Sequence, residues 1–224
     1  APPQGGGPKR ELHRVLAARQ AEADRAPSRN DLERDFRSVH DDVEIGDAGG
    51  KAVSLARIAR DTDLLVPPGF VVTVGGYDRF LKANRLEQLV LDELAELSPG
   101  DSRLAAVSDR LVNLILNAVV PEDLVASMQA HYRTIEQRTR PGIRLAMRSS
   151  AVREDSDASF AGQYRSVLNV GGDGLADAYK EVVASSFSPR AISYRQMAGI
   201  DLAETPMCVL GLAMVDVAAS GVLY

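Results

Sequence analysis

The hydrophobic pattern of this chain changes at Pro141-Gly142, and this change constrains the fold more than any other feature. Before it, apolar side chains recur every three or four positions over 86–97, 104–115 and 124–135, which predicts amphipathic helices. After it, apolar residues alternate with others from Ile143 to Arg148, which predicts a half-buried strand that ends at Arg148. The chain must therefore combine a helical layer with a sheet.

Other segments follow the same two patterns. Strands are predicted at 70–74, 164–170 and 207–215, and helices near 52–59, 77–84 and 175–187. The elements do not follow a strict βαβ repeat, so the predicted fold class is α+β. Because Val222 to Tyr224 resembles the start of another strand, we expect a domain that is incomplete at its C-terminal end.

Residues 1–41 differ in character from the rest. They open with a Pro/Gly-rich stretch, carry one short apolar helical stripe around Leu12 to Leu16, and are interrupted by turn residues at Pro27 to Asp31. We interpret them as an N-terminal extension with a peripheral helix, and residues 42–224 as the domain itself.

Composition excludes several classes of protein. The chain has 224 residues, of which 45% are apolar and 25% charged, which excludes a disordered, collagen-like or coiled-coil chain. A net charge of −5 argues against a nucleic-acid partner. The longest apolar run, 206–215, is too short to span a membrane, and no secretory signal is recognised. The single cysteine, Cys208, excludes an internal disulfide, so we expect a cytoplasmic protein.

The first candidate for chemistry is Gly49-Gly50-Lys51, directly before a predicted helix. Glycines let backbone N–H groups approach an anion, the helix N-terminus adds positive potential, and a lysine supplies a mobile charge. Ala52 follows the lysine, so the P-loop pattern is excluded. The alternative, a tight turn with a solvated lysine, stays open.

The second candidate is the segment from Met147 to Gln163, where an arginine, two serines and a second arginine lead into a loop of small residues. Guanidinium groups pair with phosphate oxygens, and a small-residue loop can close over them. Equally, Arg148 and Arg153 could form a surface ion-pair cluster with the acidic residues of 154–157.

Taken together, these segments resemble the N-terminal ATP-binding domain of the pyruvate phosphate dikinase and phosphoenolpyruvate synthase family. The resemblance rests on blocks that occur in the same order: Gly49–Leu55, Val66–Thr73, Arg148–Ala151 with Glu154-Asp155, Ala158–Gln163, Leu168–Val170, Ala184–Ser188, Ala191–Arg195 and Ala219–Val222.

This resemblance implies an ATP-grasp fold, in which ATP lies between two α+β lobes. It implies an enzyme that passes a phosphoryl group from ATP to a carrier histidine on a separate domain, and from there to pyruvate. The ATP-binding residues implied by motif match are Lys51, Arg148, Gly162, Gln163, Ser166 and Leu212.

Each of these positions has an implied role. Lys51 and Arg148 would contact the phosphates, so we predict that they project into one cleft. Gly162 and its neighbours would form a loop, from Ala151 to Gly162, that is mobile without ligand. Ser166 would face the nucleotide where relatives often have threonine, and Leu212 stands where relatives carry a glutamine near the adenine.

No catalytic or metal-binding residue is expected within these 224 residues. The resemblance implies that the Mg²⁺ ligands and the carrier histidine lie beyond Tyr224, and His131 is interpreted as structural. The chain alone should therefore bind ATP weakly and transfer no phosphate.

Two alternatives remain open at this point. One is an antibiotic phosphotransferase of the rifampin type, which shares these N-terminal motifs. The other is a non-catalytic nucleotide-binding module that regulates a partner. The expected partners are ATP and, through other domains, pyruvate or another phosphoryl acceptor, with neither nucleic acid nor membrane.

Overall fold

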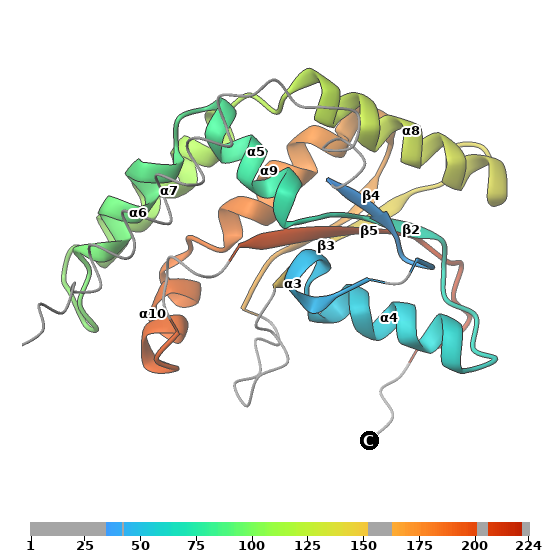
Figure 1. Ribbon diagram of the computed structural model, residues 1–224, viewed down its shortest axis with the longest axis horizontal. Coiled ribbons are helices and arrows are strands. Elements are labelled where there is room, and N and C mark those ends of the chain that lie inside the picture. The colour runs from blue at the N-terminus through green and yellow to red at the C-terminus, as the bar shows by residue number, and fades with distance from the viewer. Residues whose placement is uncertain (1–34, 42, 152–162, 201–205, 221–224) are drawn as a thin grey trace, which may run out of the picture.

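The computed structural model describes residues 35–41, 43–151, 163–200 and 206–220, which form a mixed α+β domain around one sheet (Figure 1). The elements are, in chain order, β1 (Phe36–Ser38), α3 (Ile45–Ala48), α4 (Gly50–Asp61), β2 (Gly69–Val72), α5 (Val74–Ala83), α6 (Glu87–Ala95), α7 (Leu104–Asn117), α8 (Glu122–Arg138), β3 (Leu145–Ala151), β4 (Ser166–Val170), the 3-10 turn η1 (Gly172–Gly174), α9 (Leu175–Ser185), α10 (Pro189–Met197) and β5 (Met207–Ala213). The α+β class is as predicted.

The sheet has five strands in the order β1-β2-β5-β3-β4, and every neighbouring pair is antiparallel. Strand β5, the last strand in the described part of the chain, therefore lies at the centre. All seven of its residues are buried, which explains why its sequence is a nearly continuous apolar run instead of an alternating one.

One face of the sheet, which we call the covered face, carries the main core. Helices α5, α8 and α9 lie above it in Figure 1, with α6 and α7 to their left. Phe70, Gly211 and Met147 stand next to one another across β2, β5 and β3. A Cβ on Gly211 would lie 3.0 Å from Met147 Sδ and 3.1 Å from the Phe70 ring. The glycine therefore lets these two large side chains meet in the core.

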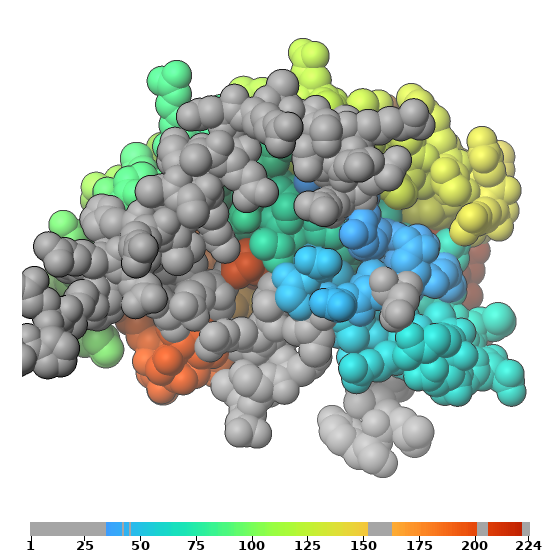
Figure 2. Space-filling model, in the orientation of Figure 1, coloured from blue at the N-terminus to red at the C-terminus, as the bar shows by residue number. Residues whose placement is uncertain are grey.

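The other face, which we call the open face, is covered over only part of its width. Residues opposite one another in antiparallel strands share a face, so Val71, Leu210, Arg148 and Ser166 form one row across β2, β5, β3 and β4. Val71 and Leu210 are buried in a small core under α3 and α4, whereas Arg148 and Ser166 are exposed. Figure 2 shows α3 and α4 as a continuous surface, coloured blue to cyan.

Strand β3 does not end at Arg148 as predicted but continues to Ala151. Its partner β4 stops at the Arg148–Ser166 pair, whereas β5 goes on pairing with β3 up to Ala151–Met207. Beyond Arg148, β3 therefore has lost its pairing with β4, and its pairing with β5 alone continues the strand to Ala151.

Three elements were not predicted. Strand β1 lies inside the segment 1–41 and pairs with β2, so the sheet begins before residue 42; the peripheral helix lies outside the described residues. Helix α3 directly precedes Gly49, in a segment for which no helix was predicted. Helix α10 was missed although Ser188-Pro189 is a helix-start signal: Ser188 Oγ accepts from the Ala191 N–H.

His131 has the structural position that the sequence suggested. Its ring stacks on Phe36 and Phe70, with centroid distances of 5.1 and 5.6 Å, and so joins α8 to β1 and β2. Within the described part of the chain, no single helix is long and apolar enough to cross a membrane; α7 and α8 pass that test only as a pair bent by 74°.

Candidate functional site

The turn between α3 and α4 lies directly on β3. Gly49 has φ 77°, and a Cβ on it would lie 2.0 Å from the backbone oxygen of Ser150, so only glycine fits. Lys51 is in the first turn of α4, half-buried, and its Nζ donates to Ser149 Oγ at 3.5 Å. The start of α4 therefore places a lysine beside the residue that follows Arg148.

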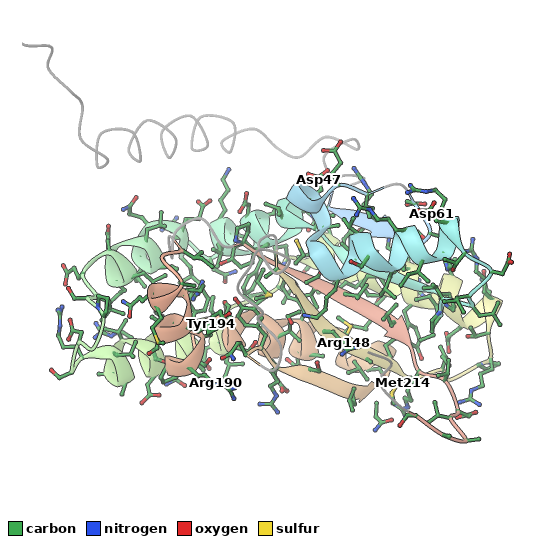
Figure 3. All side chains as sticks on the ribbon, turned by 90° about the horizontal axis from the view of Figure 1, so that it is seen from below. Asp47, Asp61, Arg148, Arg190, Tyr194 and Met214 are labelled. Atoms are coloured by element: carbon green, nitrogen blue, oxygen red, sulfur yellow. The ribbon has the colours of Figure 1, made fainter. Side chains whose placement is uncertain are left out.

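Arg148 is exposed on the open face of β3, between α4 and β4 (Figure 3). Its side chain makes no hydrogen bond or ion pair with any residue that the structure describes. The ion-pair cluster considered from the sequence involves Arg153 and residues 154–157, which lie outside the described residues. A planar guanidinium with its donors available suits a phosphate group.

Ser166 and Leu212 lie on the same face as Arg148 but in different surroundings. Ser166 is exposed and directly opposite Arg148. Leu212 is only 9% exposed and packs with Ala48 and Ala52 under the α3–α4 segment. Met214, two residues further along the same face, is half-buried, and its sulfur accepts from the Asn169 N–H at 3.3 Å.

Gln163 is anchored to α10, because its Oε1 accepts from Arg190 Nε at 2.9 Å (Arg190 is labelled in Figure 3). Close by, the Arg165 N–H donates to Ser185 Oγ at 3.0 Å, and its guanidinium lies 3.0 Å from Glu181. The chain entering β4 is thus fixed to α9 and α10. Gly162, and the predicted mobility of the loop before it, lie outside the described residues.

The structure therefore brings Arg148, Ser166 and Leu212 to one face of the sheet, although they come from β3, β4 and β5. Helix α4 packs on that same face, but the Lys51 ammonium reaches Ser149, whose side chain belongs to the opposite face of β3. That Lys51 and Arg148 share one cleft stays a prediction. One cavity, of about 590 Å³, lies at the other end of β3 and β4, around Tyr132, Arg144 and Asp177. It contains none of the predicted ATP-binding residues.

Buried polar groups near the site serve the fold. Burial raises the pKa of the Cys208 thiol well above its usual range, and the thiol donates to the Asp47 backbone oxygen at 3.3 Å, so this cysteine is not poised as a nucleophile.

Among the described residues, no group of three or more His, Cys, Asp or Glu side chains is placed to hold a metal ion. The Mg²⁺ ligands expected beyond Tyr224 stay a prediction.

Two residues with a part in this arrangement were missed or misread from the sequence. Arg190 belongs to the unpredicted helix α10, and its contact with Gln163 joins residues 27 positions apart. Ser149 and Ser150 were considered together as part of a segment that suits phosphate binding, but Ser150 is fully buried and bonds to backbone. The alternation that predicted β3 contains the signal that the two serines differ, since neighbouring side chains in a strand point to opposite faces.

Comparison with known proteins identifies a matching domain family and several relatives of this chain. The sequence model of the pyruvate phosphate dikinase AMP/ATP-binding domain matches residues 45–224. The chain is 35% identical over 185 residues to a probable phosphoenolpyruvate synthase of Methanothermobacter thermautotrophicus, which covers 81% of this chain and 27% of that protein. It is 36% identical over 196 residues to the phosphoenolpyruvate synthase of Aquifex aeolicus, and this match covers 82% of this chain and 23% of that protein.

A relative with another name is about as similar. The rifampicin phosphotransferase of Bacillus subtilis is 32% identical over 179 residues, which is 79% of this chain and 20% of that protein. The chain thus spans between a fifth and just over a quarter of the length of these relatives. On the match over residues 45–224, the chain belongs to the pyruvate phosphate dikinase AMP/ATP-binding domain family.

Proposed function

We propose that this chain is the ATP-binding part of a phosphoenolpyruvate synthase-like dikinase, and that it forms the N-terminal portion of an ATP-grasp fold. The observation that carries the proposal is the half of the open face that none of the described helices covers. There an exposed arginine without a partner among the described residues stands beside the glycine-led start of a helix that carries a lysine.

The proposed chemistry follows from these groups. Lys51 and Arg148 hold the phosphates of ATP, because fixed cations next to the triphosphate offset the charge that develops as a phosphoryl group leaves. Ser166 faces the nucleotide, and Gln163 and Gly162 belong to the loop over the phosphates. Residues beyond Tyr224 would hold Mg²⁺, which would supply further positive charge to the phosphates, and a carrier histidine elsewhere in a longer protein would accept the phosphoryl group.

The phosphoryl acceptor is the part of the proposal for which a second candidate has support. Relatives named as rifampicin phosphotransferases are 32% and 35% identical to this chain, against 35% and 36% for relatives named as phosphoenolpyruvate synthases. We propose pyruvate as the acceptor. Incubating the full-length protein with ATP and either pyruvate or rifampicin, and detecting the phosphorylated product, distinguishes the two.

The ATP-binding role is tested by calorimetric titration of Mg-ATP into the full-length protein and into this chain. We expect binding to the full-length protein and binding at least tenfold weaker, or none, to the chain, since each ~1.4 kcal/mol of lost contact energy costs tenfold in affinity. No binding to the full-length protein would refute the proposal. ATP binding without phosphorylation of either acceptor would favour a regulatory nucleotide-binding module.

A further inference from the structure

The Ser150 hydroxyl joins strand β3 to both sides of the α3–α4 turn. It accepts the Ala52 N–H at 3.1 Å and donates to the Ala48 backbone oxygen at 2.8 Å. The side chain is fully buried, and these partners come from positions about a hundred residues earlier in the chain. Its single proton is used, so this hydroxyl is committed to the backbone and not to a ligand.

The bond to Ala52 replaces a helix cap. Ala52 is the third residue of α4, and its N–H is one of the donors that a helix start leaves unsatisfied. Usually the side chain of the N-cap residue accepts that N–H, but the N-cap here is Gly49, which has no side chain. Ser150 supplies the missing acceptor from another strand.

The cap also sets the distance between the two proposed phosphate contacts. Lys51 directly precedes Ala52 in the chain, and Arg148 lies two residues before Ser150 on the same face of β3. The close fit of Gly49 on Ser150 leaves no room for the turn to slide along the strand. A single hydroxyl therefore ties the backbone of Lys51 to the strand of Arg148.

We infer that Ser150 is a positioning residue of the nucleotide site: it caps α4 from β3 and so fixes Lys51 relative to Arg148. This inference rests on the proposed function of Lys51 and Arg148 as phosphate contacts. Ser150 itself does not touch the nucleotide. Its loss leaves a buried N–H and a buried carbonyl without a partner, which frees the first turn of α4.

The test measures the Kd for Mg-ATP in the full-length protein carrying Ser150→Ala, Lys51→Ala or both. A matched control is Ser108→Ala, which removes another buried hydroxyl, one that donates to the Phe187 oxygen at 2.6 Å within the main core. We expect S150A to weaken ATP binding about tenfold and S108A to leave it within about twofold. The double variant should bind no more weakly than K51A alone, because both changes remove the same contact.

Hydrogen exchange gives a second measurement that does not depend on nucleotide. The Ala52 amide should exchange faster in S150A and be unchanged in S108A. Equal ATP losses in both serine variants, additive losses in the double variant, or unchanged exchange at Ala52 would each overturn the inference. If K51A binds ATP normally while Ala52 exchange still rises in S150A, the assignment of Lys51 in the proposed function is refuted and the positioning role falls with it.

Ser150→Thr keeps the hydroxyl and serves if S150A does not fold. It should bind ATP within about threefold of the unaltered protein, with the Ala52 amide protected. A folded threonine variant that protects Ala52 but has lost ATP binding would show that the cap does not position the site.

Discussion

The two faces of the sheet are formed by the same strands but differ in packing: the covered face is buried in the main core, and the open face is partly exposed. On the covered face, neighbours such as Phe70, Gly211 and Met147 fit together so closely that one added methyl group would meet two side chains. On the open face, the row that contains Arg148 is packed over only half of its length: Val71 and Leu210 are buried under α3 and α4, whereas Arg148 and Ser166 are exposed. The difference teaches that a strand can hold the core with one set of residues and present a site with the other.

This division gives a clear expectation for adjacent residues. Residues that alternate along β3 should separate into those that control stability and those that control nucleotide binding, with the buried serines as the exception. The following changes test that separation, in order of decreasing expected effect.

The largest effect is expected from Met147→Ala on the covered face. Met147 is fully buried, and truncation of such a side chain costs about 2–5 kcal/mol through lost burial and the cavity left behind. Urea unfolding of the protein measures the loss. Arg148→Ala, one residue further on, is the control and should change stability by less than about 0.5 kcal/mol. Similar losses in both variants would show that the two faces are not independent.

For nucleotide binding, the larger effect is expected from the change on the open face. Arg148→Ala should weaken Mg-ATP binding about 10- to 100-fold, since a hydrogen bond to a charged group contributes about 1.5–3 kcal/mol. Arg148→Lys should recover part of the loss, because lysine keeps the charge but not the two-pronged geometry. Calorimetry on the full-length protein measures both. Unchanged affinity in R148A would remove the open face from consideration as the site.

A smaller loss of affinity is expected from Ser166→Ala, opposite Arg148. One neutral hydroxyl contributes about 0.5–1.5 kcal/mol, so ATP affinity should fall between about twofold and tenfold, without loss of stability. Ser185→Ala is a useful contrast, because its hydroxyl accepts the Arg165 N–H and should affect how β4 begins. An unfolding midpoint lowered by S166A would contradict the assignment of Ser166 to the site.

The smallest effect concerns pH and belongs to the covered face. Burial lowers the pKa of His131, and Asp41 opposes this in part. The folded protein therefore binds the proton less readily than the unfolded chain does. The contribution of His131 to stability is then complete above the ordinary histidine pKa of about 6.5 and is lost as pH falls through and below it. Thermal unfolding between pH 8 and pH 5 should show this decline, and His131→Gln should flatten it; equal slopes in both proteins would exclude the effect.

Local patterns were sufficient for most helices and strands. Apolar residues every three or four positions lie on the buried sides of α6, α7 and α8, and alternation around Met147 predicted β3. These signals are readable because each helix or strand buries its own stripe of residues. Strand β1 was not predicted because its three residues are too few to show a period, and tertiary contacts hold it: it pairs with β2, and Phe36 stacks on His131.

The residue types of the candidate site could also be predicted, but not their surroundings. The sequence by itself determined that a glycine-led lysine and a strand arginine are present, and that Leu212 lies on a buried strand. Only the tertiary structure decided that Leu212 packs under α4, that Gln163 is held by Arg190, and that Ser150 bonds to the α3–α4 turn and not toward a ligand. The physical reason is distance along the chain: Ser150 and Ala52 are 98 positions apart, and no local pattern reports which backbone groups a buried hydroxyl meets when the sheet brings them together.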